Sequence, residues 1–87
     1  MVTGNSLLDR VQAIVARVAG PARMPAHVTA DTPLGEDGYW LDSIAILEVL
    51  VACEEEFGLI FDWQHELTRD ALSTVRRLAG LIETKTP

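Results

Sequence analysis

Residues 41–58 read LDSIAILEVLVACEEEFG, and this stretch decides the architecture that we expect. Apolar residues recur at helical spacing from Ser43 to Phe57, and Gly58 suits the left-handed conformation in which many helices end. Asp42 and Ser43 can each accept a hydrogen bond from the unpaired amides of a first helical turn. The stretch therefore predicts a helix over residues 43–57. Because one cap is enough, either Asp42 or Ser43 is not needed for it.

This helix has an apolar stripe on one side and a second stripe, with two aliphatic and two acidic residues, on the other. At about 100° per residue, the first stripe covers an arc of roughly 60° and is expected to face the core. Its members are Ile46, Leu50, Cys53 and Phe57. The second stripe lies on the other side and consists of Ile44, Glu48, Val51 and Glu55. The second stripe is either a chance group of exposed aliphatic side chains or a docking surface with an acidic rim for a basic partner.

The flanking sequence predicts a small all-α bundle of three main helices plus one short helix, in a single domain over residues 1–87 with its core at about 6–83. The first helix is expected over residues 7–18, and the last over about ten residues after a Ser73 or Thr74 cap. The short helix is expected at Arg69–Leu72. Residues 20–41 form a connection long enough to suggest a functional loop.

Composition limits the classes of function. The chain has 87 residues and a net charge of -6, and none of its seven Lys and Arg residues lies between Met24 and Thr68, where ten acidic residues lie. This distribution argues against a nucleic-acid binder. No metal-ligand spacing, catalytic motif, secretory signal or membrane span is recognisable, so we expect a cytoplasmic monomer that is not an enzyme and binds neither metal nor membrane.

The sequence also predicts the places of one cysteine and two tryptophans. Because Cys53 is the single cysteine, the chain cannot form an internal disulfide, and its position on the apolar helix face predicts a buried, inert thiol. Trp40 and Trp63 are expected to anchor the core, since large aromatic side chains help a small core most.

The segments Leu41-Asp42-Ser43-Ile44, Leu47-Glu48 and Glu54-Glu55-Glu56-Phe57-Gly58 resemble the acyl carrier protein family, and the resemblance extends over about residues 6–83. It implies that Ser43, flanked by Asp42, carries 4'-phosphopantetheine, which a phosphopantetheinyl transferase supplies from coenzyme A. The arm would hold an acyl group as a thioester for partner enzymes with basic docking surfaces. In the family, the second stripe of this helix recognises partners, and the first lines an acyl cavity.

The loop before Ser43 is longer and more aromatic than in compact fatty-acid carriers, because it contains Gly35-Glu36-Asp37-Gly38-Tyr39-Trp40. The chain therefore resembles discrete carriers of polyketide or other specialised metabolism. Three alternatives stay open at this point: a carrier of fatty-acid biosynthesis, an aminoacyl or peptidyl carrier, and an acidic helical adaptor that binds a basic partner without any arm.

Overall fold

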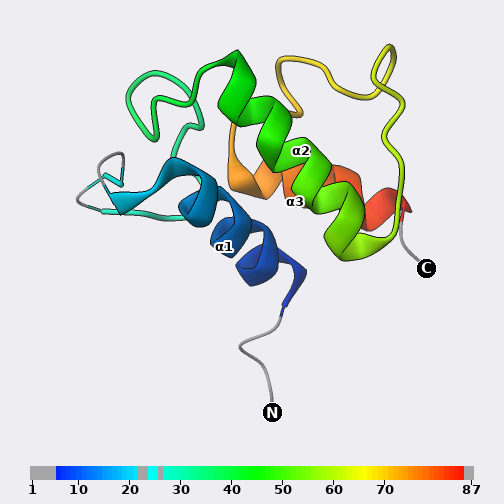
Figure 1. Ribbon diagram of the computed structural model, residues 1–87, viewed down its shortest axis with the longest axis horizontal. Coiled ribbons are helices and arrows are strands. Elements are labelled where there is room, and N and C mark those ends of the chain that lie inside the picture. Colours follow the sequence, from blue (N-terminus) through cyan, green and yellow to red (C-terminus); the bar gives the residue numbers. More distant parts are fainter. Residues whose placement is uncertain (1–5, 22–23, 26, 86–87) are drawn as a thin grey trace.

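The computed structural model describes residues 6–21, 24–25 and 27–85, which form an all-α bundle. Its helices are α1 (Leu7–Ala19), α2 (Ser43–Phe57) and α3 (Val75–Lys85). Helix α1 packs against both α2 and α3, which cross each other in projection (Figure 1). The described residues contain no strand, only an isolated bridge between Pro33 and Thr74. The prediction of three main helices is confirmed.

Short polar side chains set where α1 and α3 begin. The Ser6 hydroxyl accepts a hydrogen bond from the Asp9 amide at 3.1 Å, and the Thr74 hydroxyl accepts one from the Arg77 amide at 3.1 Å. These caps satisfy amides that have no partner within the helix. Thr74, and not Ser73, is therefore the cap of the last helix.

The short helix expected at Arg69–Leu72 is a hydrogen-bonded turn instead of a helix. The Leu72 amide donates to the Thr68 carbonyl at 3.1 Å, and the Ala71 amide donates to the Thr68 hydroxyl at 3.1 Å. The Ser73 amide then bonds to the Asp70 carbonyl at 3.1 Å. The turn does not extend because a single helical turn gains few hydrogen bonds for the residues that it orders.

The core uses a different pair of aromatic residues from the one expected. Trp40 and Trp63 are 60% and 45% exposed, so the prediction that they anchor the core is wrong. Tyr39 and Phe61 are buried instead, at 0% and 2% exposure. Burial raises the pKa of Tyr39, whose hydroxyl has no hydrogen-bond partner within the described part of the chain, although the Gln12 side chain lies close enough to offset part of that rise.

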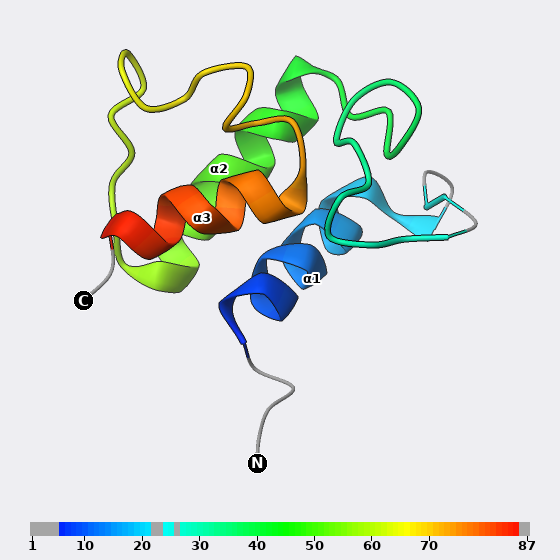
Figure 2. The same ribbon diagram turned by 180° about the vertical axis from the view of Figure 1, so that it is seen from behind.

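Two long loops flank the first turn of α2, and both views show α2 beginning between them (Figures 1 and 2). The first loop, residues 27–41, is joined to the start of α3 by backbone hydrogen bonds. The Leu34 amide donates to the Ser73 carbonyl at 2.9 Å, and the Arg76 amide donates to the Ala30 carbonyl at 2.9 Å. The second loop, residues 59–72, runs from the end of α2 to the start of α3.

Candidate functional site

Of the two candidates for the cap of α2, Asp42 and Ser43, only one caps the helix. Asp42 is the cap, because its Oδ1 accepts a hydrogen bond from the Ala45 amide at 2.8 Å. Ser43 is the first residue of the helix and is exposed, and its hydroxyl makes no hydrogen bond to any residue that the structure describes. Asp42 therefore caps the helix, and the Ser43 hydroxyl is not needed for the cap.

The chain has two other serines, and their hydroxyls are engaged. Ser6 caps α1, and the Ser73 Oγ donates to the Asp70 carbonyl at 2.7 Å. Only Ser43 combines an exposed, unengaged hydroxyl with the first turn of a helix that another side chain caps. The partial positive charge at a helix N-terminus favours an anionic group attached at this place.

The first loop delivers the chain to Ser43 along a defined path. The amides of Tyr39, Trp40 and Leu41 donate to the carbonyls of Pro33, Gly35 and Leu34, each at 2.9 Å. Since these bonds close the loop on itself, the residue that precedes the Asp42 cap has a fixed position, and Leu41 is 8% exposed.

An apolar groove of about 410 Å³ opens beside Ser43. Its walls come from α2 and from the second loop, and its lining residues are Ser43, Ile46, Leu47, Leu50, Trp63, Leu67 and Leu72. A second cavity of about 470 Å³ shares Ile46 and Leu72 with the groove and reaches Glu36 and Arg69. The Ser43 hydroxyl therefore lies at the edge of a space in which apolar groups can leave water.

The predicted acyl-cavity residues divide into two pairs. Ile46 and Leu50 line the groove. Cys53 is fully buried in the core instead, and the half-buried Phe57 lies under the Arg10 guanidinium, 4.6 Å from its ring centroid. Burial, followed by the charges of nearby glutamates, raises the pKa of Cys53 to about 12, which agrees with the inert thiol that we expected.

Sequence reasoning missed the half of the groove that the second loop supplies. Trp63, Leu67 and Leu72 lie outside any helix, so helical spacing could not assign them to a face. The signal available was the apolar character of Leu67 and Leu72 in an otherwise polar segment. Leu47 was missed for another reason, since it lies between the two stripes of α2 and is 46% exposed.

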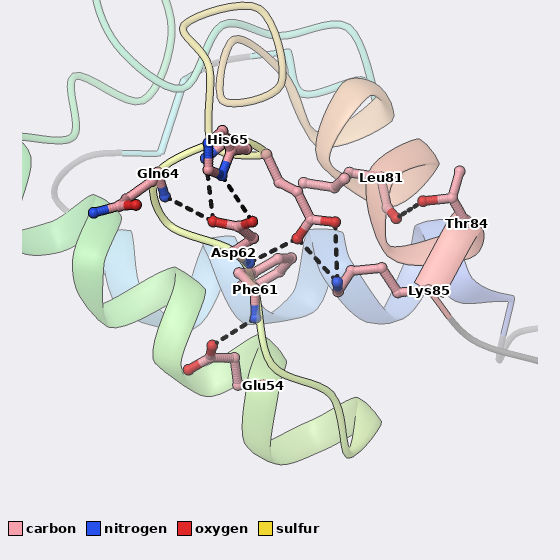
Figure 3. A network of polar contacts seen from close by, with 9 residues as sticks. Glu54, Phe61, Asp62, Gln64, His65, Leu81, Thr84 and Lys85 are labelled. Atoms are coloured by element: carbon pink, nitrogen blue, oxygen red, sulfur yellow. Dashed lines mark hydrogen bonds and ion pairs between the residues drawn. The ribbon is translucent and has the colours of Figure 1, made fainter.

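A network of polar contacts holds the second loop against α2 and α3 (Figure 3). The Glu54 carboxylate accepts from the Phe61 amide at 2.9 Å, and the Glu66 carboxylate accepts from the Asp62 amide at 2.7 Å. Lys85 Nζ, on α3, donates to both Glu66 carboxylate oxygens at 2.9 and 3.0 Å. The Asp62 amide, followed by Lys85, lowers the pKa of Glu66, so the ionised carboxylate is the form that the network stabilises.

The second stripe of α2 faces solvent. Ile44 and Val51 are 70% and 41% exposed, and Glu48 and Glu55 are exposed beside them. Neither glutamate forms an ion pair with a residue that the structure describes. Four cations pair with acids elsewhere; the pairs are Arg10–Glu56, Arg76–Asp31, Arg77–Asp70 and Lys85–Glu66. Within the part of the chain that the structure describes, no cation therefore neutralises the negative charge of the stripe.

Across residues 6–21, 24–25 and 27–85, no three His, Cys, Asp or Glu side chains lie close enough together to hold a metal ion. In the same part of the chain, each helix is too short or too polar to cross a membrane.

Comparisons with models of known protein families, with curated proteins and with solved structures found no match to this chain.

Proposed function

We propose that this chain is an acyl carrier protein in which Ser43 carries a 4'-phosphopantetheine arm. The observation that carries the proposal is the free, exposed Ser43 hydroxyl at the Asp42-capped start of α2, on the edge of an apolar groove. A serine that capped its own helix would have its hydroxyl engaged by the backbone. Here the cap is provided separately, and the hydroxyl is accessible to an enzyme.

The attachment is a group transfer from coenzyme A that the transferase catalyses. The Ser43 oxygen bonds to the phosphorus that bears pantetheine, the bond to the bridging oxygen of the pyrophosphate breaks, and adenosine 3',5'-bisphosphate leaves. The hydroxyl proton passes to a base of the transferase. The contribution of this chain is to hold the oxygen outside the helix and to favour the resulting phosphodiester anion at the helix N-terminus. Once attached, the arm supplies a thiol that forms thioesters.

The groove favours an apolar acyl cargo over an aminoacyl one. Apart from Ser43, its lining consists of five aliphatic side chains and one indole, with no carboxylate to bind an ammonium group. Burying an unpaired charge among such side chains is costly, whereas burying an aliphatic chain is favourable. Polyketide and fatty-acid intermediates both meet this requirement.

The second stripe of α2 is the surface on which partner enzymes dock in this proposal. Its support is the exposed apolar centre of Ile44 and Val51 between two glutamates that have no cation beside them among the described residues. We expect Glu48→Lys and Glu55→Lys to slow association with a basic partner by about tenfold, and raised salt to slow the wild type. Asp9→Lys, on α1, makes the same charge change away from the stripe and should leave association unchanged.

The test is the intact mass of the protein after incubation with coenzyme A and a broad-specificity phosphopantetheinyl transferase. The wild type should gain one phosphopantetheine, Ser73→Ala should gain it as well, and Ser43→Ala should gain nothing. An unmodified wild type would overturn the proposal and favour the adaptor without an arm, whose binding would survive Ser43→Ala and still depend on Glu48 and Glu55.

A further inference from the structure

Trp40 is a large apolar side chain that the fold displays to solvent. It is 60% exposed, while its neighbours Tyr39 and Leu41 are 0% and 8% exposed. Its amide donates to the Gly35 carbonyl at 2.9 Å, within the hydrogen-bonded loop that ends at the Asp42 cap. The indole is therefore presented from a backbone whose path is fixed on both sides.

The backbone of Trp40 lies in the left-handed region, with φ at 57°. Bulky residues rarely adopt this conformation, because the Cβ approaches the following carbonyl oxygen. The energetic cost of a strained backbone is usually offset by packing of the side chain in the core, but the Trp40 side chain remains mostly in water. Strain without burial indicates that the side chain has a use outside the folding of the chain.

The surroundings of Trp40 indicate the character of the partner. Glu36 and Asp37 lie in the same loop, are exposed and form no ion pair with the described residues. Arg69 lines a cavity together with Glu36 but does not pair with it. Ile44, 70% exposed, follows four residues after Trp40 and belongs to the second stripe of α2. An exposed indole in a loop that also carries two carboxylates without an ion pair among the described residues complements a basic surface that contains an apolar pocket.

We propose that Trp40 anchors the basic enzyme that modifies Ser43, the phosphopantetheinyl transferase, by inserting its indole into an apolar pocket of that enzyme. This inference rests on the proposed function. Because Trp40 is three residues before Ser43, an enzyme that reaches the Ser43 oxygen covers the loop as well. The fixed backbone lowers the entropy cost of docking, since the anchor is already in place before the encounter.

The test compares Trp40→Gly with Ile60→Ala as substrates of the transferase, with kcat/KM for the carrier as the readout. Ile60 is the control because it is another large apolar side chain exposed in a loop, at 80%, and it does not line the groove. Trp40→Gly should lower kcat/KM by about tenfold, mostly through KM, whereas Ile60→Ala should stay within about twofold of the wild type.

Glycine is chosen because it adopts a φ of 57° without strain, so a loss of folding does not explain a loss of docking. The melting temperature of Trp40→Gly should stay within about 3 °C of the wild type. A kcat/KM of Trp40→Gly within about twofold of the wild type, or an equal loss in Ile60→Ala, would overturn the anchor while leaving the carrier proposal intact. A wild type that gains no arm would overturn both.

Discussion

The two loops that flank the start of α2 are held in different ways. The first loop, residues 27–41, is closed by backbone hydrogen bonds and by the close approach of Gly38 to Pro33, and its one ion pair within the described residues, Asp31–Arg76, is exposed. The second loop, residues 59–72, depends on carboxylates and on Lys85. The first therefore fixes the residues that lead into Ser43, while the second forms a groove wall whose attachment responds to charge. The two loops therefore differ in how they would respond to a loss of charge.

Gly38→Ala should break the first loop and have the largest effect on stability. A Cβ at Gly38 would lie 1.9 Å from the Pro33 carbonyl oxygen, which is backbone and has little room to move. We expect a loss of about 3 kcal/mol or more in the free energy of unfolding, measured by urea denaturation. Gly35→Ala is the matched control, because a Cβ there meets nothing within 4 Å. Equal losses in the two variants would contradict the close approach.

Lys85→Met should loosen the second loop and lower the stability by less than Gly38→Ala does. The variant keeps most of the aliphatic stem of Lys85 but removes its ion pair with Glu66. The side chains of Lys85 and Glu66 are only 20% and 28% exposed. We expect the melting temperature to fall by about 2–5 °C, and the fluorescence of Trp63 to change in a Trp40→Phe background. An unchanged Trp63 signal would show that the ion pair does not position the groove wall.

Acid should detach the second loop before the first. The pKa of Glu66 is lowered from its ordinary value of 4.5, and His65 lowers that of Asp62. A carboxyl whose pKa is depressed by folding contributes stability above its unfolded value, and this contribution is lost as pH falls through the folded value. The loss should therefore begin below about pH 4.5 for Glu66. In the first loop, Arg76 lowers the pKa of Asp31 from its ordinary value of 3.8, so the loss of that contribution begins at a lower pH.

The readout uses two variants that each keep one tryptophan. Trp40→Phe reports on the second loop through Trp63, and Trp63→Phe reports on the first through Trp40. The Trp63 signal should change at the higher pH, and Lys85→Met should raise that pH further because Glu66 loses a cation. Coincident transitions in both variants would mean that the loops unfold together with the core.

The sequence predicted the helices better than it predicted the site. Helical spacing and the Gly58 signal placed α1 and α2 within one residue of their observed ends, because these signals are local. The assignment of Trp40 and Trp63 to the core failed because their burial depends on contacts that fold the loops. The choice of Asp42 over Ser43 as the cap likewise needed the actual backbone geometry, since both side chains are suitable.

Alkylation of thiols in the native protein tests the central claim most directly, because the arm would end in a thiol and Cys53 is fully buried, with its pKa raised to about 12. At neutral pH, the untreated protein should take up no iodoacetamide without denaturant. After treatment with coenzyme A and the transferase, the wild type should be alkylated once and Ser43→Ala not at all. A treated wild type that stays unalkylated, or a Ser43→Ala variant that is alkylated equally, would contradict an arm on Ser43.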